Sequence, residues 1–225
     1  MSPDAAIWVI VALSLKVAAA ATIVLLPVAW GLAWVLAHKR GRGVLLLDAL
    51  IHLPLVLPPV VVGYVLLILF APAGPLGRLL DAIGVKPPLF SWEGAAIASA
   101  VMALPLAVRS IRLSLEAIEP EVDESARLLG AGTLKRILRI ALPLSLPGLL
   151  AAAVLAFARA LGEFGATITF VAAVPGETLT LPLAIHAALQ EPDGEPLAWR
   201  LSLFSAALSL GALIGADLIA RRLRR

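Results

Sequence analysis

The chain has 225 residues, of which 61% are hydrophobic and only 15% are charged. Such a composition has too little polar surface to cover a soluble globule, so it predicts an integral membrane protein. The net charge of +3 is spread over the ends of apolar runs, which argues against nucleic acid as a partner, and the absence of cysteine excludes disulfides, thiol nucleophiles and zinc–thiolate sites.

Five apolar stretches are long enough to cross a membrane, for which a helix needs about 20 residues. They cover roughly residues 7–37, 44–71, 95–115, 144–163 and 200–220. We therefore expect an all-α integral membrane protein in which residues 1–225 form a single transmembrane domain. The first stretch contains Lys16 and Pro27 and continues past signal-peptide length, so it is predicted to be a retained span.

Basic side chains gather in three segments that five spans would place on one side of the membrane. These segments are the turn at 38–43, the region from Arg109 to Arg139, and the C-terminal residues 221–225. The positive-inside rule assigns this side to the cytoplasm, with the N-terminus outside and the C-terminus inside.

The second stretch contains three prolines, Pro54, Pro58 and Pro59. Proline removes a backbone donor and kinks a helix, so this span should be bent or locally unwound. Membranes tolerate such a break only where the freed carbonyls face protein or a water-filled cavity. The bend can serve a gate or a pore lining, or it can serve helix packing alone.

Two segments between the spans are predicted to lie on the outer face. Residues 72–94 should form a loop with a short helix near 76–83 and with Trp92 as an interfacial anchor. Residues 164–199 contain two apolar pieces that are each too short to span, which favours a re-entrant or interfacial segment. Charge alone leaves a sixth and seventh span open.

Several ionisable residues fall inside the predicted spans, where they carry functional weight. Lys16 is expected to extend its ammonium group to the outer surface, and Asp217 to pair with Arg221. Arg159 and Glu163 also stand four residues apart. If they pair, the site is neutral and structural. If they do not, Arg159 is a cation suited to passing an anion, with hydroxyl donors from two neighbouring threonines, Thr167 and Thr169.

Residues 116–143 form a polar interruption in the apolar chain. Acidic residues occupy its first part and basic residues its second part, as in a short helix that complements its own dipole. Pro120 suits the helix start, and Gly130 with Gly132 suits its end. We interpret the segment as a helix lying across the membrane face, shaped to enter a groove on another protein.

The same segment carries a spaced motif: Glu124-Ser125-Ala126, three residues, Gly130, nine residues, Ile140, one residue, Leu142-Pro143. This resembles the coupling loop of membrane subunits of bacterial ATP-binding-cassette importers, with Ser125 as the only departure. The resemblance implies that Glu124, Ser125 and Ala126 contact an ATPase groove, that Gly130 makes the turn, and that Ile140, Leu142 and Pro143 anchor the return into the membrane.

Two longer runs, residues 52–64 and 157–170, resemble the permease subunits of molybdate importers. That resemblance implies a type I importer fold in the bacterial inner membrane, in contact with lipid. It also implies a homodimer of this chain, two copies of a cytoplasmic ATPase that binds ATP and magnesium, and a periplasmic molybdate-binding protein. Tungstate should travel as well. Sulfate and thiosulfate permeases are the nearest alternative.

Motifs of hydrolytic chemistry are missing from the sequence. It has no G-x-x-x-x-G-K-[ST] loop, no H-E-x-x-H and no G-x-S-x-G, and its three histidines fall in different segments. We therefore expect neither a catalytic residue, a cofactor nor a metal site in this chain, and His52 is expected to be a polar residue at a helix end. An ATP-independent secondary carrier and a membrane scaffold are the alternatives from other classes.

Overall fold

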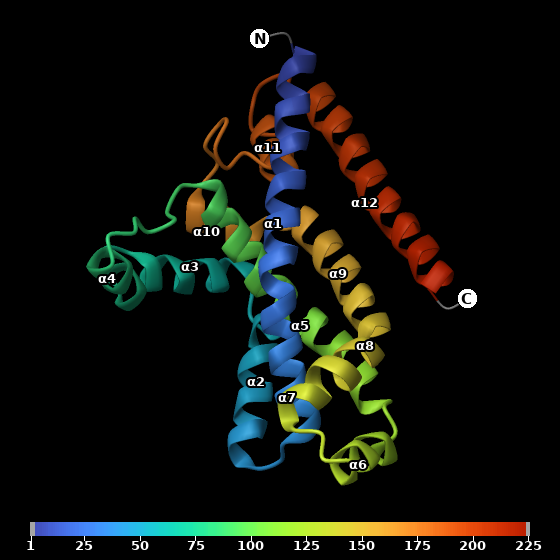
Figure 1. The fold of residues 1–225 in the computed structure, drawn as a ribbon. Coiled ribbons are helices and arrows are strands. Elements are labelled where there is room, and N and C mark those ends of the chain that lie inside the picture. Colours follow the sequence, from blue (N-terminus) through green and yellow to red (C-terminus); the bar gives the residue numbers. More distant parts are fainter. Residues whose placement is uncertain (1–2, 224–225) are drawn as a thin grey trace.

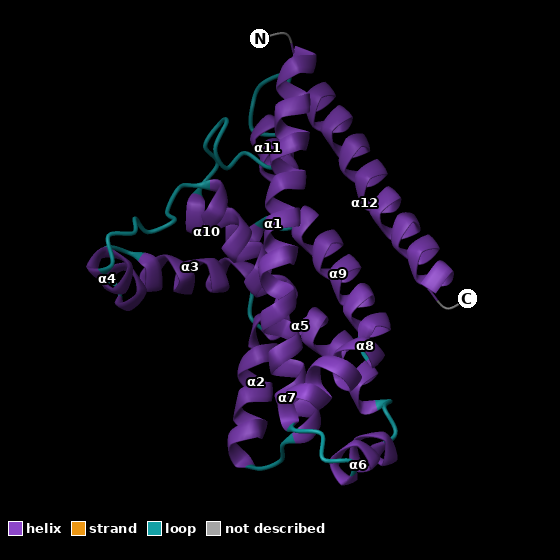
Figure 2. Cartoon of the chain, viewed as in Figure 1, coloured by secondary structure: helices purple, strands orange, loops and turns teal. Residues whose placement is uncertain are grey.

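The computed structural model describes the backbone of residues 3–223 and the side chains of residues 7–212, 214 and 215. Helices account for all regular secondary structure in these residues, and loops connect them (Figure 2). This confirms the predicted all-α class. The pair Asp217 and Arg221, predicted from their spacing, lies outside the described side chains.

Two long helices form the centre of the molecule, α1 (Pro3–His38) and α5 (Trp92–Glu116), and α9 (Leu146–Leu161) packs against both. Their contact faces are built largely from alanine. Ala29 and Ala33 of α1, Ala107 of α5 and Ala152 of α9 are completely buried in one cluster. Small residues of this kind let apolar helices approach closely, which is how helices associate when the surrounding lipid is equally apolar.

The predicted second span is divided into two helices, α2 (Arg42–Val56) and α3 (Pro59–Phe70). Their axes differ by 117°, so the interruption at Leu57 and Pro58 is a full change of direction and a larger one than a kink. Figure 1 shows α3 running sideways from the central helices. The short helix α4 (Pro75–Ala82) follows, close to where residues 76–83 were expected to be helical.

The polar segment after α5 folds into several short pieces. They are α6 (Pro120–Leu128), α7 (Thr133–Arg136), a π-helical turn (Ile137–Ala141) and α8 (Leu142–Leu144). The chain then bends by 65° into α9. In Figure 1 this segment lies at the end of the molecule opposite to the N-terminus.

The segment at 164–199 contains two short helices, α10 (Gly165–Val171) and α11 (Leu181–Ala188). Helices of seven and eight residues are about 10–12 Å long, so neither can span a membrane. α10 packs against α3 and α5, whereas α11 packs against α1 and the last helix, α12 (Glu195–Leu223). The backbone amide of Leu181 donates to the hydroxyl of Ser14 at 2.8 Å, which fixes the start of α11 on α1.

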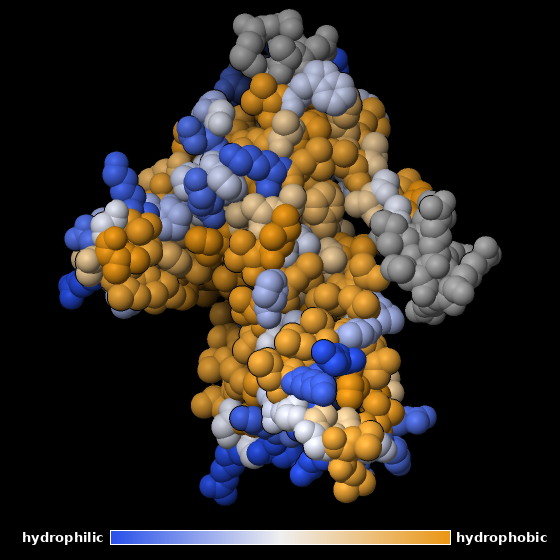
Figure 3. All heavy atoms as spheres, in the orientation of Figure 1, coloured by the Kyte–Doolittle hydropathy of each residue, from blue (hydrophilic) through white to orange (hydrophobic). Residues whose placement is uncertain are grey.

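Among the described residues, α1 and α5 are long and apolar enough to cross a membrane. The number of spans rises to as many as four if two bent pairs each count as one span, namely α2 with α3, and residues 133–144 with α9. Figure 3 shows a broad apolar surface around the middle of the molecule, with hydrophilic side chains concentrated near the end that carries α6 and around the outer loops. The total of five spans and the N-out, C-in orientation remain predictions.

Candidate functional site

The residues of the spaced motif lie on a helix that projects from the end of the bundle. Pro120 occupies the first turn of α6, with Glu121 and Asp123 beside it and Arg127 in the last turn, so the charges complement the helix dipole. Glu124, Ser125 and Ala126 lie in the middle of α6. None of the α6 residues is buried, so the helix is accessible on the surface of the chain.

Gly130 reverses the chain after α6. Its φ is +77°, a conformation that glycine adopts at no steric cost and that few other residues, chiefly asparagine, tolerate. The amide of Gly130 donates to the carbonyl of Arg127 and that of Ala131 to the carbonyl of Ala126, both at 2.9 Å, which satisfies the last carbonyls of the helix. No atom lies within 4 Å of the place that a Cβ on Gly130 would occupy, so conformation and not crowding sets the requirement for glycine.

An ion pair joins the two arms of this loop. Arg136 at the end of α7 contacts the carboxylate of Asp123 on α6. The Arg136 side chain is 18% exposed, and its Nε is buried without a hydrogen-bond partner. The pair therefore holds α6 against the returning chain, although thirteen residues separate the two side chains.

The return towards α9 is tied to α1. Ile140 belongs to the π-helical turn, and Leu142 and Pro143 belong to α8. Directly after them, the buried hydroxyl of Ser145 accepts a hydrogen bond from Nε1 of Trp30 at 2.9 Å and donates to the carbonyl of Leu142 at 3.0 Å. Ser145 and Trp30 were not among the residues expected to anchor the loop.

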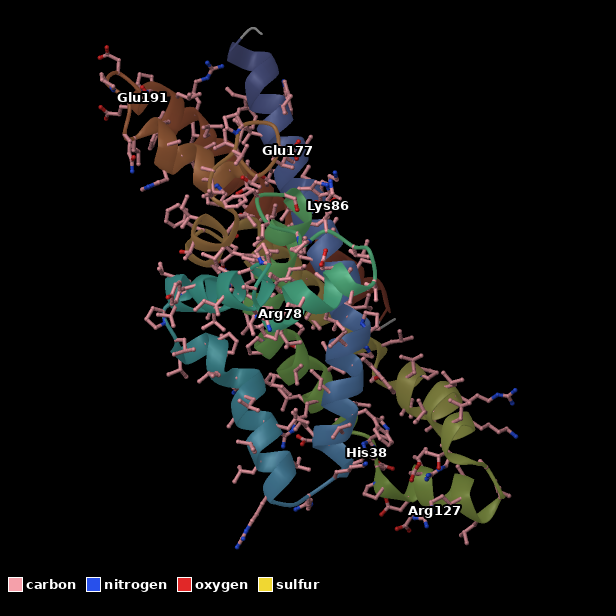
Figure 4. All side chains as sticks on the ribbon, turned by 90° about the vertical axis from the view of Figure 1, so that its left-hand side faces the viewer. His38, Arg78, Lys86, Arg127, Glu177 and Glu191 are labelled. Carbon is pink, nitrogen blue, oxygen red and sulfur yellow. The ribbon has the colours of Figure 1, made fainter. Side chains whose placement is uncertain are left out.

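Exposed leucines at the tip of the loop were also missed. Leu128 is 90% exposed, Leu129 is 88% exposed and Leu134 is 70% exposed. They surround the turn at Gly130, at the far end of the molecule, where Figure 4 labels Arg127. Apolar residues within a polar segment were the signal that could have identified them, because a cluster of exposed leucines is a common feature of protein-interaction surfaces.

Of the three prolines, Pro59 lies where the start of α3 meets the start of α10. Pro54 lies inside α2, Pro58 in the break, and Pro59 at the start of α3. A Cβ on Gly165 would lie 2.8 Å from Cβ of Pro59, and a Cβ on Gly63 would lie 2.4 Å from the carbonyl oxygen of Ala166. The starts of α3 and α10 therefore touch backbone to backbone, directly after the break between α2 and α3.

Glu163 lies at the junction of α9 and α10, and it has two partners. It forms an ion pair with Arg159, and its Oε1 accepts the amide of Ala166 at 2.9 Å. Its side chain is only 1% exposed. Of the two readings left open by the sequence, the structure thus contains the paired one, in which the carboxylate stabilises the start of α10.

The two threonines beside this pair differ. The hydroxyl of Thr169 is occupied, because it donates to the carbonyl of Gly165 at 2.9 Å within α10. The hydroxyl of Thr167 is buried and has no hydrogen-bond partner. Neither hydroxyl is directed to Arg159 by any contact in the described part of the chain.

Lys16 meets Trp92, a contact that the sequence did not indicate. The Lys16 ammonium lies 3.6 Å from the centroid of the Trp92 ring, a cation–π contact between α1 and the start of α5. Twenty-two residues separate Lys16 from His38 at the other end of α1, which corresponds to about 33 Å of helix. This length matches the hydrocarbon thickness of a bilayer, about 30 Å.

A cluster of charges between α2 and α5 was missed as well. Arg112 contacts Asp48 at 3.1 Å and Glu116 at 2.7 Å, and Nδ1 of His52 lies 3.0 Å from Oδ1 of Asp48. His52 thus lies beside the ion pairs that Arg112 makes with Asp48 and Glu116, and its prediction as a polar residue at a helix end did not include these neighbours. Among the described residues, no group of three His, Asp or Glu side chains is placed to hold a metal ion.

Residues 25–225 match the sequence profile of a family described as "Binding-protein-dependent transport system inner membrane component". Over 215 residues the chain is 49% identical to the molybdenum transport system permease protein ModB of Escherichia coli K12, covering 95% of this chain and 93% of that protein. The corresponding protein of Haemophilus influenzae is 48% identical over 213 residues, with the same coverage.

Two more distant proteins are also similar to this chain. The sulfate transport system permease protein CysT of Salmonella typhimurium is 37% identical over 194 residues, which are 86% of this chain and 69% of that protein. A solved bacterial ABC transporter that imports the acidic polysaccharide alginate matches the fold with a TM-score of 0.76 at 19% identity, covering 96% of this chain and 79% of that chain.

Proposed function

The chain belongs to the family of binding-protein-dependent transport system inner membrane components, and we propose that it is the permease subunit of an ATP-driven importer of molybdate. The family is a membrane permease component and is not itself the ATPase. The type I importer architecture expected from the sequence agrees with the fold match to the alginate importer.

The observation that carries the proposal is the exposed coupling segment. α6 is unburied, it is held by the Asp123–Arg136 pair and the Gly130 turn, and its tip carries exposed leucines. An ATP-independent carrier has no use for such a segment, and a scaffold, which needs no conducting path, has no use for the broken span formed by α2 and α3. We propose that α6 seats in a groove of a separate ATPase, which binds ATP and magnesium, with two ATPase copies serving two copies of this chain.

The substrate follows from the relatives. Identity to molybdenum permeases reaches 49%, whereas identity to the sulfate permease is 37%. Molybdate is therefore the proposed substrate, with tungstate as a second substrate because of its nearly identical charge and size. A periplasmic binding protein would deliver the anion. One solved alginate transporter contains a periplasmic protein of this kind, in complex with its own saccharide ligand.

The proposed mechanism is alternating access. When ATP closes the two ATPase subunits, the two copies of α6 are drawn together, and the spans rearrange so that the path opens outward to receive the anion. Hydrolysis resets the transporter. The start of α10 lies against the start of α3, directly after the break between α2 and α3, which suits a segment that must change its angle.

The test is uptake of labelled molybdate and labelled sulfate into vesicles that contain this chain, its ATPase and its binding protein. We expect uptake of molybdate only with ATP on the ATPase side, and little competition from excess sulfate. Preferential sulfate uptake would keep the mechanism and change the substrate. Uptake without ATP would reject the importer proposal.

A further inference from the structure

A cavity of about 430 Å³ lies between α2 and α5, apart from the coupling loop and from the α3–α10 contact. Five ionisable side chains line it: Asp48, His52, Arg109, Arg112 and Glu116. Leu45, Ala49 and Leu113 complete the lining. Ionisable groups in spanning helices are costly, and they mark ion or substrate paths by default.

The cavity lies beside the last two turns of α5, near the end of the bundle that carries the coupling loop. Arg109 precedes the end of α5 at Glu116 by seven residues, which is about 10 Å along the helix. Arg109 also lies 17 residues, about 25 Å of helix, from Trp92, so a bilayer core of about 30 Å that begins at Trp92 would place Arg109 about 5 Å inside its inner edge, near the coupling loop. The cavity is also open to the surface, so a small ligand can reach it.

The two arginines of the cavity differ in their ion pairs. Arg112 takes part in ion pairs with both carboxylates, Asp48 from α2 and Glu116 from its own helix. Arg109 stands one turn before Arg112, is exposed, and makes no ion pair or side-chain hydrogen bond with any described residue. The guanidinium of Arg109 is therefore the cation that remains available to a ligand.

We propose that this cavity is a transit site for the transported oxyanion and that Arg109 is its principal ligand. The planar guanidinium presents several N–H donors in a fixed arrangement, which suits two oxygens of a tetrahedral dianion. This inference rests on the proposed function, because it assigns a site to the substrate of that importer.

The carboxylates of the cavity set the strength of this site. Oδ1 of Asp48 is buried and accepts no hydrogen bond, although Nδ1 of His52 lies 3.0 Å away, and Glu116 adds a second negative charge. Both groups oppose a dianion, so the anion is held weakly by Arg109 with help from Arg112. Weak binding suits a transport path, since a conducted ion must leave the site as readily as it enters.

The first test replaces Arg109 in the complete transporter. Arg109→Gln is expected to lower molybdate uptake about tenfold or more, the value of one lost charge-assisted contact. Arg109→Lys should lie between Gln and wild type. ATP hydrolysis stimulated by the loaded binding protein should persist in both variants. Arg78→Gln on α4, outside the cavity, is the matched control and should transport normally.

Failure of the inference and failure of the proposed function give different results. A wild-type transporter that takes up no molybdate rejects the proposed function. If the wild-type transporter takes up molybdate and the Arg109→Gln variant takes it up equally well, the transit site is rejected and the proposed function stands. Loss of both uptake and stimulated ATP hydrolysis in Arg109→Lys also rejects it, because the arginine is then structural.

A second test detects the ligand directly and uses the absence of native cysteine. Ala49→Cys places one thiol in the cavity, and Ala82→Cys at the exposed end of α4 is the control. Molybdate should slow labelling of Cys at position 49 by a small thiol reagent and leave position 82 unchanged. The protection should disappear when Arg109→Gln is combined with Ala49→Cys.

The phosphate of an anionic lipid shares the chemistry of an oxyanion, so the labelling is repeated in two membranes. In vesicles of phosphatidylcholine alone, molybdate should protect position 49. Protection that requires phosphatidylglycerol and ignores molybdate would mean that the cavity binds a lipid headgroup, and it would overturn the proposal.

Discussion

Glu163 is buried where α9 ends and α10 begins, and its carboxylate faces both Arg159 and the amide of Ala166. The spacing of four residues was enough to suggest the ion pair from the sequence. The hydrogen bond to Ala166 was not foreseeable, because it depends on where α9 stops. The pairing of Glu163 with Arg159 favours a structural role for both side chains and argues against Arg159 as a free cation in the transport path.

Removal of Arg159 tests that role. Arg159→Gln leaves a buried carboxylate without its cation, and we expect it to destabilise the protein by about 3 kcal/mol. The double variant Arg159→Gln/Glu163→Gln should recover part of this loss. Heat-induced loss of folded protein in detergent provides the measurement. Unchanged stability with lost molybdate uptake would instead place Arg159 in the path.

Gly130 was predicted as the turn after the coupling helix, and its role in coupling remains a prediction. We expect Gly130→Glu to insert normally but to lose stimulation of ATP hydrolysis, because the residue must hold φ at +77° and a carboxylate would enter the ATPase contact. Gly130→Asn is the matched control, since asparagine tolerates this conformation. Equal stimulation in both variants and wild type would contradict the assignment.

At the scale of elements, the exposed leucines give α6 a face that the acidic motif residues do not supply. Leu128→Ala/Leu129→Ala should weaken retention of the ATPase by this chain at least about tenfold, because two fully exposed leucines lose apolar area that would be buried in the contact. Co-purification at graded ATPase concentrations provides the measurement. Leu197→Ala, at the start of α12, should have no effect, and equal losses in both variants would point to misfolding.

The contact between α3 and α10 depends on two glycines. Gly63→Ala forces a methyl group to within 2.4 Å of the Ala166 carbonyl, so the helices must separate, at a cost of about 1–3 kcal/mol. Gly31→Ala in α1 has no atom within 4 Å of the new methyl group and should be neutral or slightly stabilising. The measurement is the thermal stability of the two variants. Equal changes in Gly63→Ala and Gly31→Ala would mean that the close contact between α3 and α10 does not form.

Element positions followed from the sequence where local signals were strong. Apolar run lengths indicated α1 and α5, and Pro120 with Gly130 indicated the ends of the coupling helix. The 117° turn between α2 and α3 was underestimated, because prolines show that a helix breaks but not in which direction it continues. The Asp48–Arg112 pair joins residues 64 positions apart, and only the packing of α2 on α5 brings them together.

At the scale of the molecule, the charge distribution predicts which end faces the cytoplasm. The structure places residues suitable for testing this prediction at the two opposite ends. Figure 4 shows Glu177 and Glu191 towards one end and His38 and Arg127 towards the other. The Lys16–Trp92 contact lies between them, about 33 Å of helix from His38. We expect this contact to mark the outer boundary of the hydrocarbon core.

Single cysteines provide the topology measurement. In intact cells with a permeable outer membrane, Glu177→Cys should react with a membrane-impermeant thiol reagent and Arg127→Cys should not. In inverted vesicles without the ATPase the order should reverse. Labelling of both residues from one side would reject the predicted N-out, C-in orientation. The same result would reject an odd number of spans between them.

The π-helical turn at Ile137–Ala141 accommodates one residue more per turn than an α-helix does. It lies between the coupling helix and α9, so it sets the rotational phase of one relative to the other. Deleting one residue there would restore an α-helical turn and rotate everything before it by about 100° around the helix axis. α6 would then point away from the proposed groove of the ATPase with all of its own side chains intact. The nine-residue interval between Gly130 and Ile140 thus specifies a direction in space as well as a length.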